Sequence, residues 1–276
     1  MAPAGIFITG FLALPLLFCG SLSLFRVDLL SGLPPSFVGG KNYLALFHDL
    51  RLGKSLVNTV VFTAASVGVE TLLGLVFALW LSRQFLGRGI CRTASLIPWI
   101  LPTAVMATAW RWMFNDTFGV VNDVGRRLGL IQSPLVWLGD PALAMTAMVA
   151  ADVWKTTPFM TLIVLAGLQS IPGELYEAAH VDGAGPWRRF WLVTWPGVRA
   201  LLLVAVLFRA IQAFGMFDLV WVMTGGGPAD ATTTVSLYLY QKFLRDLDLG
   251  YASALTVVLA AGLMGGVWAF SRMRER

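Results

Sequence analysis

Tyr251 to Ser271 reads YASALTVVLAAGLMGGVWAFS and contains no charged residue. A helix needs about 20 apolar residues to cross the hydrocarbon core of a bilayer, so this stretch is long enough to span a membrane. A segment in lipid must satisfy its backbone polar groups internally, and a helix does this. The stretch therefore predicts a helical membrane protein.

The remainder of the chain repeats this pattern. Of its 276 residues, 57% are hydrophobic and only 13% are charged, with a mean hydropathy of +0.75, whereas a soluble domain carries charge on about a quarter of its residues. The alternating ten-residue segments of a membrane barrel do not occur, so the predicted fold class is all-α. We expect one domain, 1–276, with about six spanning helices at 3–25, 56–81, 93–112, 141–168, 198–224 and 251–271.

Several other classes fit the composition poorly. Residues 2–25 lack the basic start of a cleaved signal peptide and are interpreted as the first span. The net charge is +5, but the basic residues are scattered, with no basic stripe for nucleic acid. Cys19 and Cys91 suggest neither a metal site nor a disulfide framework, and we expect no cofactor on this chain.

The charges on the connections predict an orientation. Six spans place both termini on one side, together with the loop that holds Arg83, Arg88 and Arg92 and the segment that holds Arg188 and Arg189. The positive-inside rule makes that side cytoplasmic. The opposite loops also carry basic residues, but these are spread over longer loops and offset by aspartates.

The connection at 170–197 is the most informative one. Pro172 and Gly173 stop one helix, 174–182 is rich in helix formers with an acid near its start, and Gly183 can end that helix. We expect a short helix, a glycine turn and a second helix, both lying at the membrane surface. Ala178 and Ala179 would give a smooth face that another protein could approach closely. A surface helix pair without a partner is the alternative.

One pattern in this connection is specific. Glu177-Ala178-Ala179, then Gly183, Val193 and Trp195-Pro196 resemble the signature loop of the membrane subunits of ATP-binding-cassette importers, where Ile and Leu usually stand in place of Val193 and Trp195. The resemblance implies a type I importer permease fold in which this loop is the coupling helix that docks on a cytoplasmic ATPase. It assigns ATPase coupling to Glu177, Ala178, Ala179, Asp182, Gly183, Arg188 and Pro196.

Other stretches resemble the carbohydrate-importing branch, and the maltose-permease first-subunit type within it. They are Phe37 to Tyr43 with Asn58-Thr59, Ile97 to Pro102 with Trp110 to Asn115, and Met223 to Pro228. The resemblance does not extend to the extra N-terminal helices and the large outer insertion of some such permeases, so contacts made there are not expected to carry over. The resemblance implies uptake of a sugar or polyol through a bacterial or archaeal cytoplasmic membrane. It also implies a second permease, two ATPase subunits that hold ATP and Mg²⁺, and an extracytoplasmic binding protein.

Polar residues inside the spans suggest where a solute would pass, because charges in lipid normally face protein or water. Asp152 and Lys155 share a helix face and can partly neutralise each other. By resemblance, the solute site lies on the helices that flank the coupling loop. The candidate residues are Asp152, Lys155, Thr156, Phe159, Arg209, Gln212, Ala213 and Met216, the last four at helical spacing on one predicted helix.

Structural roles are the alternative for these residues. Asp152 and Lys155 would then seal a subunit interface, and Arg209 would bridge to the partner permease or to Glu70. Glu70 itself suits either a contact between helices or a gate. Pro98 and Pro102 are expected to bend the third span.

Three other functions remain open from the residues. An ion-coupled carrier would show paired inverted repeats, which we do not find. A membrane-embedded enzyme would need converging catalytic groups, and no recognisable set appears. A structural assembly protein is the third alternative, and it would not co-purify with an ATPase.

Overall fold

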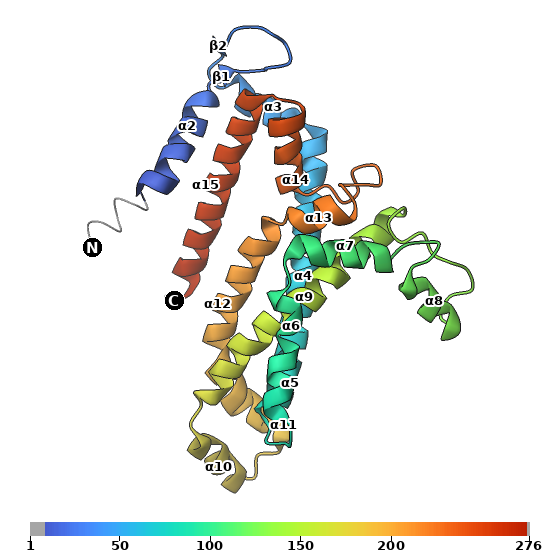
Figure 1. Ribbon diagram of the computed structural model, residues 1–276. Helices are drawn as coiled ribbons and strands as arrows, with labels where there is room; N and C mark the ends of the chain where they lie inside the picture. The colour runs from blue at the N-terminus through green and yellow to red at the C-terminus, as the bar shows by residue number, and fades with distance from the viewer. Residues whose placement is uncertain (1–8, 275–276) are drawn as a thin grey trace. The chain divides into compact units, whose positions relative to one another are not determined.

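The structure is a computed structural model that describes residues 9–274 (Figure 1). Its helices fall into two compact units. One unit holds the chain up to Val57 and again from Thr233, and the other holds Asn58–Thr232. Helix α4 (Leu50–Ser82) contributes its first turns to the former and the rest to the latter.

In the first unit, a long C-terminal helix packs against helices from the start of the chain. The elements are η1 (Thr9–Ala13), α2 (Leu14–Leu22), β1 (Phe25–Arg26), β2 (Ser36–Phe37), α3 (Lys41–His48), the start of α4, α14 (Val235–Tyr240), η3 (Gln241–Arg245) and α15 (Leu249–Arg274). Helix α15 packs on α2 and α3. Gly250 is required at its start, because a Cβ there would lie 2.3 Å from the Phe25 carbonyl oxygen.

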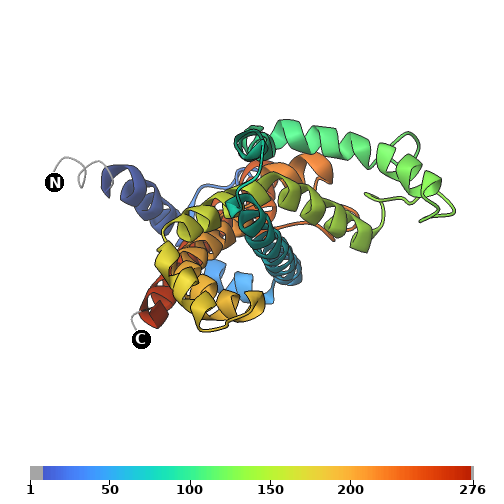
Figure 2. The same ribbon diagram turned by 90° about the horizontal axis from the view of Figure 1, so that it is seen from below.

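The second unit contains most of the long helices. Its elements are the remainder of α4, α5 (Arg88–Ser95), α6 (Ile97–Ile100), α7 (Thr103–Met113), α8 (Val120–Arg127), α9 (Pro141–Gln169), α10 (Gly173–Val181), α11 (Pro186–Arg189), η2 (Phe190–Thr194), α12 (Trp195–Phe214) and α13 (Asp218–Met223). Figure 2, a view from below, shows α7 and α8 in green extending to one side of the other helices of this unit.

The core of the second unit lies between α4, α9 and α12. These helices share an apolar cluster that includes Ala78, Met160 and Leu202. Gly74 brings α4 close to α9, because a Cβ there would lie 2.6 Å from the Cβ of Met160. Small residues allow such close approach between membrane helices.

The expected helical fold is confirmed, and the number of spans is approximate. Within residues 9–274, four helical runs are long and apolar enough to cross a membrane: Leu50–Ser82, Pro141–Gln169, Pro186–Phe214 and Leu249–Phe270. A bent pair, Arg88–Ile100 and Thr103–Met113, makes a fifth if it is counted as one span. The predicted first span begins outside the described residues, and its described part is helical from Thr9 to Leu22. The only strands in the described part are β1 and β2, a two-residue antiparallel pair.

The bend expected in the third span is present. The two halves meet at 91°. Leu101 has an extended backbone, with φ −64° and ψ 134°, and precedes Pro102. A proline disfavours the helical conformation of the residue before it, so the break falls where the sequence places it.

The helix expected over 198–224 is not continuous. Helix α12 ends at Phe214, Gly215 follows it, and a new helix, α13, begins at Asp218. Met216 therefore lies in the connection and not on the helix face that carries Arg209, Gln212 and Ala213. The prediction assumed that the helix continues past Gly215. Instead the helix ends there, and the Gly215 amide donates the last helical hydrogen bond to the Ile211 carbonyl.

Candidate functional site: an exposed helix and a buried charge cluster

Helix α10 is a short surface helix with a defined end. Pro172 precedes it in an extended conformation, with φ −60° and ψ 133°. At its end, Gly183 takes φ +74°, and the amide of Ala184 donates to the Ala179 carbonyl at 2.9 Å. A positive φ is a conformation that glycine adopts without steric cost, and such a residue commonly ends a helix. The expected short helix and glycine turn are therefore present.

The segment after the turn differs from the prediction of a separate surface helix. From Pro186 the chain runs through α11 and η2 into α12 as one helical run that reaches Phe214. Figure 1 shows α10 beside this run, at the same end of the unit as α11. A displacement of α10 would therefore act on the base of a membrane-spanning helix.

One contact ties α10 to that run, and a second ties Ile171, which precedes α10, to Gly197 of α12. The Tyr176 hydroxyl and Thr194 Oγ1 are 3.0 Å apart and share a hydrogen bond. Gly197 lies against Ile171, and a Cβ at position 197 would approach the Ile171 side chain to 2.5 Å. These contacts connect both ends of the 170–197 segment at the base of α12.

Large apolar side chains of α10 and α11 are exposed. Leu175 and Val181 of α10 are 51% and 86% exposed, and Trp187 of α11 is 74% exposed. Glu177, Ala178, Asp182, Gly183, Arg188 and Pro196 are exposed, and Ala179 is half-buried. The surface combines large apolar side chains with a small-residue face, which suits a protein partner.

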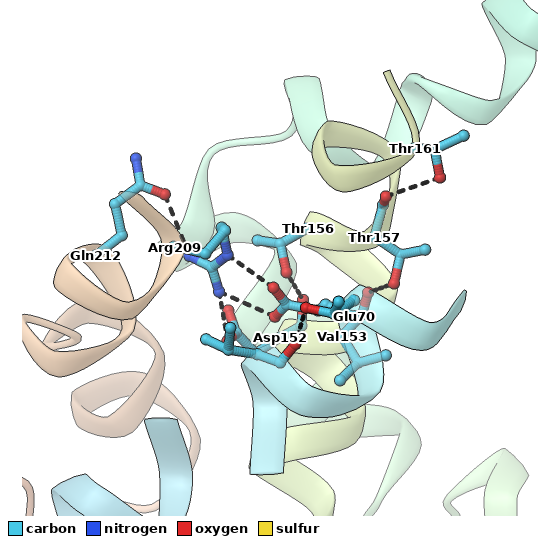
Figure 3. Close-up of polar contacts among 10 residues, drawn as sticks. Glu70, Asp152, Val153, Thr156, Thr157, Thr161, Arg209 and Gln212 are labelled. Carbon is cyan, nitrogen blue, oxygen red and sulfur yellow. Dashed lines mark hydrogen bonds and ion pairs between the residues drawn. The ribbon is translucent and has the colours of Figure 1, made fainter. Parts of the chain in front are cut away.

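A second feature is a buried ion cluster in the middle of the unit (Figure 3). Arg209 of α12 donates from Nε to Glu70 Oε2 at 2.7 Å and from Nη2 to Glu70 Oε1 at 2.9 Å. Nη2 also contacts Asp152 Oδ2 at 3.0 Å. The three side chains are at most 2% exposed. Of the alternatives for Arg209, the bridge to Glu70 is the one present, and it joins α4, α9 and α12.

The cluster also organises two other candidate residues. Gln212 Oε1 accepts from Arg209 Nη1 at 3.1 Å, and the Thr156 hydroxyl donates to the Asp152 carbonyl at 2.6 Å (Figure 3). Ala213 is fully buried. Because Arg209 contacts both carboxylates and Gln212 Oε1, the cluster joins helices in this conformation, and a solute role for its members stays a prediction.

Lys155 and Asp152 interact electrostatically, as the sequence suggested, but the ion-pair contact of Asp152 is with Arg209. The Lys155 Nζ donates to the Trp99 carbonyl at 3.4 Å, while Asp152 points to Arg209. Lys155 and Asp152 lie on the same face of α9, but the Arg209 guanidinium lies closer to the Asp152 carboxylate than the Lys155 ammonium does.

Lys155 borders a column of aromatic rings from three helices. The ring of Phe159 on α9 lies 6.0 Å from that of Trp99 on α6 and 5.4 Å from that of Phe208 on α12. Trp99 and Phe208 are each nearly half exposed. Trp99 and Phe208 were not among the predicted path residues, because helical spacing around Phe159 does not indicate which rings of other helices face it. The position of Phe208 next to Arg209 was the available signal.

Metal-ligating side chains are not grouped in the part of the chain that the structure describes. Among residues 9–274, no group of three or more His, Cys, Asp and Glu side chains is placed to hold a metal ion.

Comparisons with known proteins fit this arrangement. Residues 70–271 match the family described as binding-protein-dependent transport system inner membrane component. The chain is 48% identical over 81% of its length to the trehalose/maltose transport system permease protein MalF of Thermococcus litoralis, covering 76% of that protein. It is 42% identical over 95% of its length to the sulfoquinovosyl glycerol transport system permease protein SmoG of Agrobacterium fabrum, covering 84% of that protein.

Solved structures share the fold. A chain of a bacterial ABC transporter involved in the import of the acidic polysaccharide alginate matches with a TM-score of 0.83 at 22% identity, over 99% of this chain and 93% of that one. A chain of the alginate transporter in complex with a pentasaccharide-bound periplasmic protein matches with a TM-score of 0.85 at 20% identity, over 99% and 91%. The fold is therefore that of type I importer permeases.

Proposed function

The chain belongs to the family of binding-protein-dependent transport system inner membrane components, and we propose that it is the sugar-translocating permease subunit of an ATP-driven importer. It is a multi-pass membrane protein and a transport subunit. The named relatives carry trehalose, maltose or sulfoquinovosyl glycerol, so a disaccharide or a related glycoside is the proposed class of solute.

The observation that carries the proposal is the exposed helix α10 at the base of α12. Its apolar side chains Leu175 and Val181 are 51% and 86% exposed, and the Tyr176–Thr194 bond links it to a long apolar helix. A cytoplasmic ATPase seated on α10 would move α12 when it closes on ATP. A ligand shifts the equilibrium between two conformations only if it makes different contacts in each of them. Here the two ligands are nucleotide on the ATPase side and solute on the other side.

The proposed assembly has one further permease, two ATPase subunits and an extracytoplasmic binding protein. ATP hydrolysis resides on the ATPase subunits, and this chain holds no cofactor of its own. Both termini and α10 face the cytoplasm, in line with the positive-inside rule. The membrane is the cytoplasmic membrane of a bacterium or archaeon.

Cross-linking from α10 tests the proposal. Ala178→Cys, in membranes that contain the whole complex, is expected to capture a nucleotide-hydrolysing subunit, and Leu130→Cys in the exposed loop after α8 serves as the control. Glu177→Lys is expected to abolish uptake together with the ATP hydrolysis that the loaded binding protein stimulates. Capture of no ATPase, or normal uptake in Glu177→Lys, would overturn the coupling role. Uptake by this chain alone on a cation gradient would favour the ion-coupled carrier.

A further inference from the structure

A groove on the second unit shares no lining residue with the ion cluster or with the aromatic column. It has a volume of about 680 Å³ and runs between α4, the α5–α6 segment and α9. That volume lies within the range of roughly 300–1,000 Å³ that is usual for ligand sites. Its walls include Leu73, Phe77, Trp80, Cys91, Pro98 and Trp154.

The groove is apolar even where its walls carry hydroxyl groups. Each hydroxyl donates to a carbonyl of its own helix: Ser95 to Arg92, Thr146 to Ala142, Thr157 to Val153 and Thr161 to Thr157, at 2.6–2.9 Å. These hydroxyl groups therefore have no free donor for a sugar, although their oxygens can still accept. The groove suits a hydrocarbon chain.

One end of the groove is basic. Helix α4 ends at Ser82 just beyond the groove residues Trp80 and Leu81, and the short connection that follows carries Arg83 and leads to Arg88. The rings of Trp80 and Phe85 lie 4.9 Å apart, which folds this connection back toward α4. No acidic residue occurs in the sequence between Glu70 and Asp116. In the described part of the chain, neither Arg83 nor Arg88 forms an ion pair.

Arg92, at the same end of the groove, forms hydrogen bonds within the protein. Its Nη2 donates to the Leu81 carbonyl at 3.0 Å, and the side-chain oxygen of Gln169, turned toward it, accepts from Nη2 and Nη1 at 3.1 and 3.3 Å. Arg92 of α5 thus joins the ends of α4 and α9 at the basic end of the groove. Gln169 is the last residue of α9, so the basic end lies on the same side as α10.

We propose that this groove is a binding site for an anionic phospholipid, with an acyl chain between α4 and α9 and the phosphate at Arg83 and Arg88. In the proposed orientation this end faces the cytoplasmic leaflet, where basic pockets between membrane helices bind acidic headgroups. Charge complementarity selects the headgroup, and the apolar walls select a lipid over a free phosphate.

Lipid retention by the intact complex tests the site. The complex is purified in mild detergent, and its affinity for added phosphatidylglycerol is measured by mass spectrometry of the bound lipid. Each arginine near an anionic surface contributes binding free energy that corresponds to about a fivefold change in affinity, so the loss of one arginine should weaken binding about fivefold. The variant Arg83→Gln/Arg88→Gln should lose affinity accordingly, whereas Arg126→Gln/Arg127→Gln, an equal loss of charge on α8, should not. Equal affinity in the two variants would overturn the proposal.

Two further arms identify the occupant. Glycerol 3-phosphate should fail to displace the lipid, and Leu73→Trp should lower retention with both arginines present, because it fills the groove. Displacement by glycerol 3-phosphate with no effect of Leu73→Trp would mean a free-phosphate site instead. A photoreactive benzoylphenylalanine at Leu73 should label lipid, and labelling of a polypeptide would mean that a partner helix fills the groove.

Discussion

Arg209 and Glu70, 139 positions apart in sequence, form a two-pronged ion pair between α12 and α4, with N–O distances of 2.7 and 2.9 Å. A two-pronged pair constrains orientation as well as distance, so it limits the rotation of each helix together with their separation. Asp152 adds a helix-to-helix contact from α9 at 3.0 Å. Three helices that flank the proposed solute path are thus held together by one guanidinium.

The loss of this guanidinium should be costly. Arg209→Met leaves two buried carboxylates without their cation, and removal of one partner from a buried ion pair typically costs about 3–5 kcal/mol. Thermal unfolding of the purified complex should show a large fall in stability. Glu70→Gln should cost less, because the amide still accepts from Arg209 and Asp152 still supplies a charge.

An exposed pair provides the control for this comparison. Asp123 and Arg127 on α8 are 2.9 Å apart, but their side chains are 46% and 78% exposed. Asp123→Asn should change stability by less than about 1 kcal/mol, because water screens exposed pairs. If Arg209→Met were no worse than Asp123→Asn, the cluster would have no role in holding the helices.

The turn after α10 allows a test of backbone conformation alone. Gly183 has φ +74° and open space where a Cβ would lie, so a side chain there meets strain but no clash. Gly183→Ala should weaken coupling, since a left-handed alanine costs roughly 1–2 kcal/mol, whereas Gly183→Asn should be milder because asparagine tolerates this region. Stimulated ATP hydrolysis and sugar uptake in the reconstituted complex are the measurements.

Gly173 is the matched control in the same helix. A Cβ at this position would also meet no atom within 4 Å, but the φ of Gly173 is not positive. Gly173→Ala should leave coupling unchanged. A loss of coupling in Gly173→Ala equal to that in Gly183→Ala would mean that bulk on this surface matters, and not the turn.

The sequence predicted features that depend on neighbouring residues. The extended residue before Pro102, the short helix after Pro172 and the turn at Gly183 all follow from local rules, and all are present. The long apolar helices follow in the same way from uncharged stretches, which lipid selects.

Partners across helices could not be chosen from the sequence. Arg209 had two possible partners, and only the rotation of α4 and α12 decides between them. Lys155 and Asp152 are correctly placed on one face, but spacing does not reveal that Arg209 reaches Asp152 from another helix. Met216 was misplaced because one glycine, Gly215, is a weak signal for a helix end inside an apolar stretch.

Acid should loosen the first unit through Asp49, which lies outside the spans. Burial alone would raise its pKa, but hydrogen bonds from the Tyr238 and Tyr251 hydroxyls and from the amides of Leu52 and Arg51 outweigh this and lower the pKa below the ordinary 3.8. A carboxyl with a depressed folded-state pKa adds stability that is present above its unfolded pKa and lost as the pH falls through the folded one.

The expected pH window lies below about 4, the ordinary pKa of an aspartate. Unfolding followed from pH 6 to pH 2 should show a loss of stability in the native protein that is weaker in Asp49→Asn and in Tyr238→Phe/Tyr251→Phe. Asp116→Asn, an exposed carboxylate elsewhere, should keep the native profile. An unchanged profile in Asp49→Asn would assign the acid sensitivity to other groups.

The aromatic column should contribute to sugar affinity. A sugar presents C–H faces that stack on rings, and Phe159 lies between Trp99 and Phe208 with Lys155 nearby as a donor. Phe159→Leu keeps an apolar side chain but removes the ring, so the KM for uptake should rise roughly fivefold, in line with about 1 kcal/mol for an aromatic contact. Phe159→Tyr should stay near the native value. Phe77→Leu, a similar loss of a ring from the wall of the lipid groove, should leave KM unchanged.

Because Phe159 also packs against other rings, unfolding of each variant without sugar must be measured in parallel. A rise in KM with unchanged stability supports contact with solute, whereas a loss of stability with unchanged KM would make the column purely structural.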